Sequence, residues 1–294
     1  MRNDSASLTQ WEEPQPTGPN HDVRELIRSA VFEIIPLNSA PEAVDALPEK
    51  SRVSVTASAS KGQQATLKLT EELIERGHHA IPHFSARLIK DRSQVKDLAA
   101  WTKDNGVTSA FVVGGDATEP GAYHDAHTFM QDLFGHDHNL DTVGVAAYPD
   151  GHPLISEDVR RDALFAKQDL LAEAGLRGYC STQMCFDPTR IIAWLKAERI
   201  DGLTLPAHLG IPGAVERARL LTIGARLGVG QSLRYLRKNR RSMVKLLGSS
   251  AHDPSDLVEA LSSQLAPLGI VGLHIFTFNQ VEATAAWQQA LLHS

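Results

Sequence analysis

Three polar residues stand where apolar side chains would be expected, and each could act on a substrate. Glu33 lies within Val31–Leu37, a segment that is otherwise apolar on both faces. Asp116 follows two glycines, and Gln183 lies in another largely apolar segment. A buried carboxylate costs free energy unless it is paired or used, and a buried amide needs several hydrogen-bond partners. Because carboxyl groups can transfer protons and amides can orient polar ligands, Glu33, Asp116 and Gln183 are candidates for residues that carry chemistry.

The same residues also have structural interpretations. Glu33 could pair with a nearby basic side chain, and Asp116 could cap the turn that follows the glycines. Several histidines lie between residues 117 and 141, but they lack the spacing of metal ligands, and we interpret them as part of a solvated lid. These histidines are His124, His127, His136 and His138. No metal site is predicted.

The elements that must position these residues alternate along the chain. A short apolar or β-branched segment precedes a longer segment of helical period, and the pattern recurs about eight times, the number of strands that closes a barrel. The sequence therefore predicts an α/β fold, a TIM (β/α)8 barrel, as a single domain over residues 23–294 with a mobile tail over residues 1–22. The expected strands are Val31–Leu37, Arg52–Ser58, His79–Ser85, Ser109–Gly115, Thr142–Tyr148, Tyr179–Cys185, Gly202–His208 and Gly272–Phe278.

Amphipathic segments between these strands predict the helices that cover the barrel. They are Thr66–Gly77, Ser93–Gly106, Glu157–Gly175, Pro188–Arg199, Gly213–Gly228, Asp256–Leu268 and Val281–Leu292. Two connections are longer than a barrel requires, Ala117–Asp141 and Leu227–Asp253, and the second contains the basic run Arg234–Arg241. Long connections at the C-terminal ends of barrel strands usually serve the active site, and the basic run is either a solvated helix face or a phosphate clamp.

Side-chain alternation indicates which polar residues face the lumen of the barrel. Successive side chains of a strand point to opposite faces, and the helical layer is the more costly place for a carboxylate. We therefore expect Glu33 to face the lumen. By the same argument, the residues that face inward or upward at the mouth are Ser54, Thr56, Ser58, Asp116, Tyr148 and Gln183.

Composition favours a protein that acts on small molecules. The 294 residues are 42% hydrophobic and 22% charged, with a net charge of -6, which gives no general field for nucleic acid or an anionic membrane. No apolar run approaches the roughly twenty residues of a membrane span, and no signal peptide is recognisable, so we expect a cytoplasmic protein. The two cysteines, Cys180 and Cys185, are expected to be reduced core residues.

A series of short motifs follows the predicted strands. They are Phe32-Glu33-Ile34-Ile35-Pro36, Val53-Ser54-Val55-Thr56, Pro82-His83, Gly114-Gly115-Asp116, Ala147-Tyr148-Pro149-Asp150-Gly151-His152-Pro153, Thr182-Gln183-Met184-Cys185-Phe186-Asp187 and His274-Ile275-Phe276-Thr277-Phe278-Asn279. Each is similar to a motif of the methylenetetrahydrofolate reductase family, such as Phe-Glu-Phe-Phe-Pro, Leu-Arg-Gly-Asp or Ala-Tyr-Pro-Glu-x-His-Pro. Because the motifs occur in the family's order, nearly the whole chain, from Val31 to Phe278, resembles that family.

The resemblance implies reduction of 5,10-methylenetetrahydrofolate to 5-methyltetrahydrofolate with electrons from a nicotinamide dinucleotide. Glu33 matches the family's general acid, which protonates N10 so that the imidazolidine ring opens to an iminium. Asp116 and Gln183 would orient the pterin by hydrogen bonds, and Asp116 would also stabilise the cation. The chain therefore resembles an oxidoreductase of one-carbon metabolism.

One departure from the family concerns the flavin. Gly114 stands where the family has an arginine, and a later helix carries leucines, with Lys167 as the exception, where polar or basic residues would be expected. These leucines are Leu164, Leu170 and Leu171. FAD would lose most of its partners, so the chain resembles the flavin-independent branch known in mycobacteria, in which NADH would give its hydride directly to the folate.

In that branch the remaining polar residues could bind the dinucleotide instead of FAD. These candidate cofactor-binding residues are Thr56, His83, Gly115, Tyr148 and His152. Three alternatives stay open: an FAD-dependent reductase with altered flavin ligands, a non-catalytic barrel that binds folate or a nucleotide, and a metal hydrolase that uses the histidines of the connection after the fourth strand. The sequence is compatible with NADPH in place of NADH and with a homo-oligomer.

Overall fold

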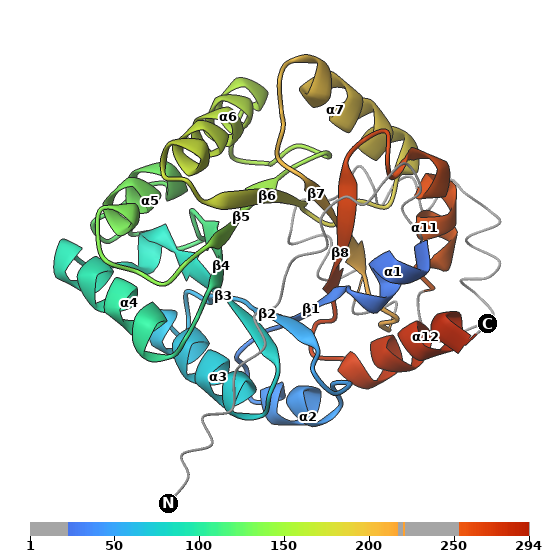
Figure 1. Ribbon diagram of the computed structural model, residues 1–294, viewed down its shortest axis with the longest axis horizontal. Helices are drawn as coiled ribbons and strands as arrows, with labels where there is room; N and C mark the ends of the chain where they lie inside the picture. The colour runs from blue at the N-terminus through green and yellow to red at the C-terminus, as the bar shows by residue number, and fades with distance from the viewer. Residues whose placement is uncertain (1–22, 217–219, 221–252, 294) are drawn as a thin grey trace, which may run out of the picture.

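The computed structural model describes residues 23–216, 220 and 253–293. Eight parallel strands form a closed barrel in which each strand pairs with the next and the last pairs with the first. The strands surround a common axis in Figure 1, with helices outside them. They are β1 (Val31–Ile34), β2 (Arg52–Val55), β3 (His79–Ser85), β4 (Ser109–Val113), β5 (Thr142–Ala147), β6 (Arg177–Thr182), β7 (Ala207–Pro212) and β8 (Ile270–Phe276). The predicted TIM barrel is confirmed.

Helices alternate with the strands and cover the outside of the barrel. They are α1 (Val23–Arg28), α2 (Ala40–Asp45), α3 (Gln63–Glu75), α4 (Arg92–Asp104), α5 (Ala126–Phe134), α6 (Glu157–Glu173), α7 (Pro188–Ile200), α11 (Ser255–Leu261) and α12 (Val281–His293), with short 3-10 turns η1 (Ala86–Leu88) and η2 (Ser262–Gln264). Three of these helices begin after an aspartate whose side chain accepts hydrogen bonds from the backbone of the first turn, namely Asp91, Asp125 and Asp187. Such caps satisfy backbone N–H groups that the helix itself leaves unpaired.

Alternating side chains of the strands pack on two surfaces. Those that point outward from β1 and β2 form a core cluster with α2, α3 and α12, and include Phe32, Ile34, Val53 and Val55. Those that point inward form a separate cluster in the lumen, made of Val31, Ile81, Phe111 and Tyr179. Glycine makes room for these rings, because a Cβ on Gly144 would lie 2.4 Å from both Phe111 and Tyr179.

The predicted seventh strand begins several residues before the strand in the structure. The prediction of Gly202–His208 is wrong for most of its length, because the strand is Ala207–Pro212. Leu203 and Leu205 are buried, but they pack in the connection after α7. The true strand carries His208, Gly210 and Pro212 on its inward face, and glycine and proline are weak indicators of a strand. The sixth strand is also shifted, since Met184 and Phe186 lie beyond its end in an apolar cluster with Phe278.

The connection over residues 117–141 is not a simple lid. It contains α5, whose buried face is made by Ala126, Phe129, Met130 and Leu133 at helical spacing. Of the four histidines predicted to form the lid, His127 lies on this helix and the others flank it. The sequence prediction also lacked α1 and α2. The predicted tail over residues 1–22 and the basic run Arg234–Arg241 lie outside the described residues, as does most of the helix expected at Gly213–Gly228.

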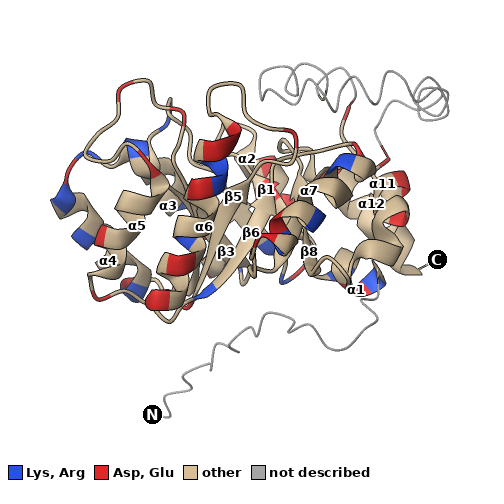
Figure 2. Cartoon of the chain, turned by 90° about the horizontal axis from the view of Figure 1, so that it is seen from above, with Lys and Arg blue, Asp and Glu red and all other residues tan. Residues whose placement is uncertain are grey.

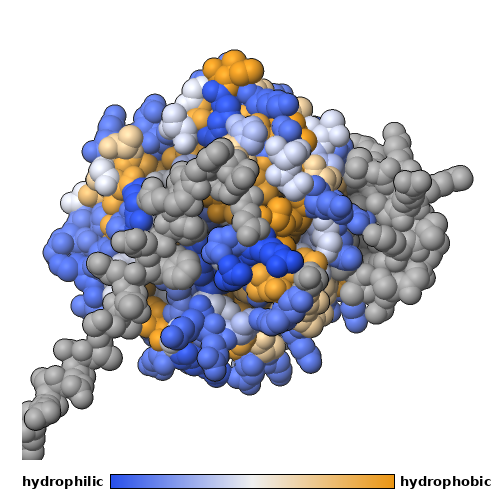
Figure 3. Space-filling view, turned by 45° about the vertical axis from the view of Figure 1, so that its right-hand side comes forward, coloured by the Kyte–Doolittle hydropathy of each residue, from blue (hydrophilic) through white to orange (hydrophobic). Residues whose placement is uncertain are grey.

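Charged residues of both signs lie on the helices and loops around the barrel (Figure 2). Polar residues cover most of the face shown in Figure 3, with apolar residues in small groups between them. Cys180 and Cys185 are both buried thiols, as predicted. No helix within the described ranges has the length and apolar character needed to cross a membrane.

Candidate active site

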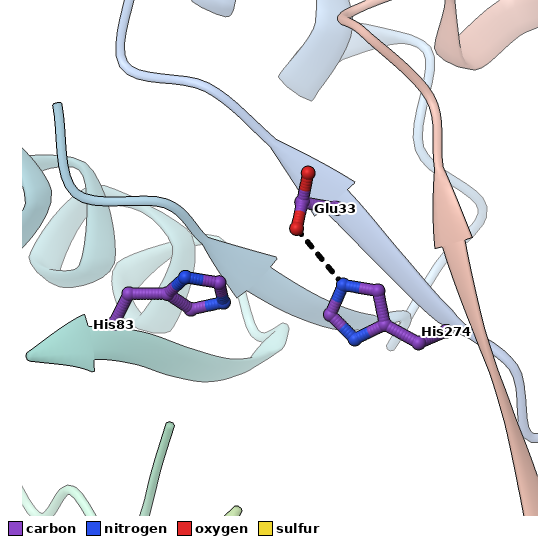
Figure 4. A group of neighbouring side chains, drawn as sticks. All are labelled: Glu33, His83 and His274. Atoms are coloured by element: carbon purple, nitrogen blue, oxygen red, sulfur yellow. Dashed lines mark hydrogen bonds and ion pairs between the residues drawn. The ribbon is translucent and has the colours of Figure 1, made fainter. Parts of the chain in front are cut away.

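Glu33 is held in the lumen by an imidazole from the neighbouring strand. Its Oε2 lies 2.9 Å from Nε2 of His274 on β8, and both residues are almost completely buried. Strands β1 and β8 are paired, with Glu33 next to Phe276 in the register, so the contact joins side chains of adjacent strands. Figure 4 shows Glu33 and His274 pointing toward each other across the interior, as the alternation in β1 predicted for Glu33.

The turn after β8 fixes the backbone around Glu33. The hydroxyl of Thr277 donates a hydrogen bond to the carbonyl oxygen of Glu33. Asn279 then binds both backbone groups of Ile35, accepting from its N–H at 2.8 Å and donating to its carbonyl at 2.9 Å. Asn279 has a φ of 63°, a conformation that asparagine tolerates better than most residues. The side chain and the backbone of Glu33 are therefore both positioned by residues that follow one another in β8 and its turn.

His83 lies in the same part of the lumen. Its Nε2 lies 2.7 Å from the hydroxyl of Ser54 on β2, and its ring packs 4.8 Å from the Phe111 ring. Burial, and then the electrostatic effect of His274, lower the pKa of His83 to about 3, so the imidazole of His83 is neutral at physiological pH. His83 was predicted to bind a cofactor, and the structure places it beside Glu33, deep in the barrel.

A second polar group lies where β4 and β5 end. Burial raises the pKa of Tyr148, and the negative charge of Asp116 raises it further. The ring of His152 meets that of Tyr148 edge to face at 5.3 Å. Burial and then the charge of Arg160 lower the pKa of His152, and Asp116 opposes this shift. Asp116 therefore acts electrostatically on both Tyr148 and His152, and the rings of these two residues are in contact.

Gly115 and Thr56 contribute mainly backbone at the mouth of the barrel. Gly115 has a φ of 91°, and a Cβ there would lie 1.9 Å from the hydroxyl oxygen of Ser85, so only glycine fits. Thr56 follows β2, where its N–H donates to the carbonyl of Ile34 at 2.9 Å. Both residues are half-buried, and each leaves part of its surface open to a ligand.

Gln183 follows β6 and faces the same end of the barrel. Its backbone N–H donates to the carbonyl of Ala147 at 2.7 Å, which joins the ends of β5 and β6. Its side-chain oxygen accepts from the N–H of Met184 at 2.8 Å. Among the described residues its amide nitrogen has no hydrogen-bond partner. This nitrogen can therefore donate to a ligand. The sequence placed Gln183 within the sixth strand, but β6 ends one residue earlier, at Thr182.

The structure brings one set of metal-ligating side chains together. Glu33, His83 and His274 place one potential ligand atom each within 4.8 Å of one another, and all three are buried. Within the described residues this is the only such group of three or more. The histidines near α5 do not join it, since His136 pairs with Asp132 at 3.6 Å and His138 accepts from the N–H of Leu140.

Sequence reasoning missed the residues that position Glu33. His274 is a polar residue inside an apolar strand, and its alternation with Leu273 and Ile275 carries the same signal that identified Glu33. Ser54 was expected to face the lumen, but not to pair with His83. The contacts of Thr277 and Asn279 could not be found by periodicity, because both lie in the turn after β8 and bind β1, more than 240 residues away.

The fold and the site together define a TIM-barrel protein whose polar residues gather at the C-terminal ends of the strands and in the lumen just below them. A profile of the family named methylenetetrahydrofolate reductase matches residues 42–291. The chain therefore belongs to the methylenetetrahydrofolate reductase family. The match includes His83, Asp116, Gln183 and His274, whereas β1 and Glu33 precede it.

Two solved structures are similar to this chain to different degrees. A protein from Clostridium thermocellum, described as uncharacterized and as binding two copies of 5-methyl-5,6,7,8-tetrahydrofolic acid, superposes with a TM-score of 0.57 at 13% identity, covering 92% of this chain and 98% of its own. It shares the barrel fold. A lysine/ornithine decarboxylase from Vibrio vulnificus, complexed with cadaverine, has a TM-score of 0.44 at 10% identity, covering 87% of this chain and 59% of its own.

Proposed function

We propose that the protein reduces 5,10-methylenetetrahydrofolate to 5-methyltetrahydrofolate, with NADH as the direct hydride donor and without flavin. The observation that carries the proposal is the buried pair of Glu33 and His274, 2.9 Å apart in the lumen of a chain that belongs to the methylenetetrahydrofolate reductase family. The barrel fold shared with a protein that binds 5-methyltetrahydrofolate makes this folate a suitable probe.

Glu33 supplies the proton in the proposed reaction. Its carboxyl group protonates N10 of the folate, the bond between N10 and the methylene carbon breaks, and the carbon becomes an iminium with N5. Hydride from C4 of the nicotinamide then adds to this carbon, so that the proton ends on N10 and the hydride in the new methyl group. His274 holds the carboxylate and can return a proton to it, since its Nε2 lies within hydrogen-bond distance.

Asp116 and Gln183 have the roles of orienting groups in this proposal. Both follow the C-terminal ends of strands, and the free amide nitrogen of Gln183 is a donor for a pterin carbonyl or ring nitrogen. The carboxylate of Asp116 is exposed and would stabilise the positive charge of the iminium. The dinucleotide would then lie against Thr56, Gly115, Tyr148 and His152, with His83 below it.

The residues of the barrel do not fit a flavin. Gly114 stands where the family motif has an arginine, and the space around a Cβ at this position is open to 4 Å. On α6 the positions expected to be polar hold Leu164 and Leu171, which are 4% and 1% exposed and pack in the core. Lys167 lies on the same face of this helix and is itself buried. These observations support direct transfer from a nicotinamide.

The visible spectrum of the purified protein tests the hydride donor. We expect a colourless protein that oxidises NADH when methylenetetrahydrofolate is added without FAD, and that forms 5-methyltetrahydrofolate in equal amount. NADPH, compared at the same concentration, shows which of the two dinucleotides the protein prefers. A yellow protein whose activity follows its flavin content would contradict the proposal and support the FAD-dependent alternative.

The variant Glu33→Gln tests the proton donor and separates an enzyme from a binding protein. We expect kcat to fall by about 10²- to 10⁴-fold, the usual contribution of a general acid, while 5-methyltetrahydrofolate still binds. The matched control is Glu282→Gln on the exposed first turn of α12, which should keep full activity. Wild-type protein that binds the folate without turning it over would show a non-catalytic barrel.

A further inference from the structure

Glu33, His83 and His274 form a set of donors suited to a metal ion. One carboxylate oxygen and two imidazole nitrogens converge from β1, β3 and β8, with the potential ligand atoms within 4.8 Å of one another. Two histidines and one carboxylate bind Zn²⁺ and other divalent transition metals in many proteins. We propose that this triad is a binding site for a divalent transition-metal cation of the zinc class, and that a bound cation blocks the proton donation of Glu33.

The distances are close to those that such an ion needs. Metal–ligand bonds of about 2.1 Å in a tetrahedral site place the ligand atoms roughly 3.4 Å apart. The atoms of Glu33 and His274 are 2.9 Å apart, and the rings of His83 and His274 have centroids 6.3 Å apart and a tilt of 41°. Closing the widest pair by at most about 1.4 Å requires small side-chain rotations and no movement of the strands.

The charge of the site also favours a cation. The triad contains one carboxylate, and the three potential ligand atoms are buried together within 4.8 Å of one another. Burial in the barrel removes competing water and strengthens the attraction between the carboxylate and a divalent ion. Three protein ligands leave a fourth position open for water or for a nitrogen of the folate.

The surroundings hold the ligands in place. Gln63 of α3 binds the backbone on both sides of Phe84, next to His83. Phe276 packs 5.1 Å from the ring of His274. Outer contacts of this kind orient metal ligands and affect the affinity of a site. The triad therefore has the rigid support that a metal site requires, although neither its spacing nor its separation along the chain resembles a sequence motif for metals.

Cobalt is the probe for binding, because Co²⁺ occupies zinc sites and its visible absorption reports coordination by protein ligands. The full-length protein is freed of metal with a chelator and titrated with CoCl₂. We expect an absorption band that saturates at one equivalent and disappears when ZnCl₂ is added. Absence of this band, or of saturation at one equivalent, would overturn the proposal.

Variants show whether the triad is the site. His83→Gln and His274→Gln should weaken binding by more than about 100-fold, because loss of an outer hydrogen-bond partner alone can cost 10- to 100-fold. The control His136→Gln removes a half-buried histidine outside the triad that also pairs with a carboxylate, and should bind cobalt as the wild type does. Circular dichroism checks folding, and the isosteric Glu33→Gln provides a third variant. Equal binding by all folded variants would refute the assignment.

Inhibition by the cation rests on the proposed function and is measured separately. Zn²⁺ should abolish the folate-dependent oxidation of NADH at one equivalent, and a chelator should restore it. Cobalt binding in a protein without reductase activity would keep the metal site and contradict the proposed function. Reductase activity in a protein that binds no cobalt would support the proposed function and contradict the metal site. Reductase activity that persists when the metal site is filled would contradict inhibition by the cation.

Discussion

At the scale of single residues, Glu33 is fixed from two directions. His274 contacts its carboxylate, and Thr277 binds its backbone carbonyl, so one short segment of β8 and its turn determines both. A general acid must lie within hydrogen-bond distance of the atom that it protonates, and a displacement of about 1 Å can cost roughly 100-fold in rate. The position of the Glu33 carboxyl group therefore depends on contacts with residues that are remote in sequence.

The variant Thr277→Val tests this dependence. Valine keeps the shape of threonine but leaves the buried carbonyl of Glu33 without its partner, which costs about 1–3 kcal/mol in stability. We expect kcat to fall by roughly 10- to 100-fold with little change in KM, because the misplaced carboxyl group acts in the proton transfer and not in binding. Steady-state kinetics and urea unfolding measure the two effects.

Thr277→Ser is the matched control, because serine keeps the hydroxyl and removes only a methyl group. It should retain kcat within about 3-fold, since a conserved donor keeps the carbonyl paired. If valine and serine lower kcat equally, packing of the methyl group and not the hydrogen bond positions Glu33.

Polar residues inside apolar strands could be predicted from sequence, whereas their partners could not. The cost of burying a carboxylate identified Glu33, and strand alternation gave its direction. His83 was assigned to a cofactor because its motif resembles one of the family, yet its contact with Ser54 places it deeper. Which side chains meet inside a barrel depends on the register of strands that are distant in sequence, and no local pattern contains this information.

At the scale of elements, the strands with regular apolar alternation were predicted well. β7 was not, because an inward histidine, glycine and proline interrupt its pattern, and Gly210 is required by close packing, with a Cβ there 2.0 Å from the carbonyl oxygen of Thr182. α5 could have been found, since Asp125 caps it and its apolar residues recur at helical spacing. The many histidines in this connection favoured the interpretation as a solvated loop over that of a helix.

The turn after β4 provides a test at this scale with two neighbouring glycines. Gly115→Ala should destabilise the protein by about 1–3 kcal/mol, because the φ of 91° is unfavourable for alanine and its Cβ would meet the Ser85 hydroxyl at 1.9 Å. Gly114→Ala should change stability by less than about 0.5 kcal/mol, because nothing lies within 4 Å of its Cβ. Urea unfolding of the two variants gives the comparison.

Adding Ser85→Ala to Gly115→Ala separates the clash from the backbone strain. We expect partial recovery, because the hydroxyl oxygen is removed while the Cβ of Ser85 stays 3.2 Å away and φ is unchanged. Equal stability of Gly114→Ala and Gly115→Ala would mean that the turn before Asp116 rearranges freely to accept a Cβ at either position.

At the scale of the whole molecule, the interior of this barrel is unusually polar. Arg52, His83, His208 and His274 are all buried, although barrels commonly fill the lumen with branched apolar residues. The barrel is stable around these polar residues because most of its apolar side chains are buried in the layer between the strands and the helices. This division explains why the fold could be predicted from apolar periodicity while the contents of the lumen could not.

The acid stability of the molecule should reflect its enclosed histidines, and His79 at the start of β3 allows a direct test. Its Nε2 is buried without a hydrogen-bond partner among the described residues. Burial, and then the charge of Arg52, lower its pKa to about 4, with Asp141 opposing. Below an ordinary pKa of about 6.5 the unfolded chain binds this proton first, so stability should fall between pH 6.5 and 4 by up to about 3 kcal/mol.

Urea unfolding at a series of pH values measures this contribution. The variant His79→Gln cannot take up the proton. Between pH 6.5 and 4 its free energy of unfolding should therefore fall less than that of the wild type, by up to about 3 kcal/mol. His293→Gln, at the exposed end of α12, should follow the wild-type curve. Parallel curves for wild type and His79→Gln would mean that His79 is protonated as easily in the folded barrel as in the unfolded chain. In that case the start of β3 must open enough to hydrate the imidazole without loss of the barrel, and acid sensitivity would have to come from other groups.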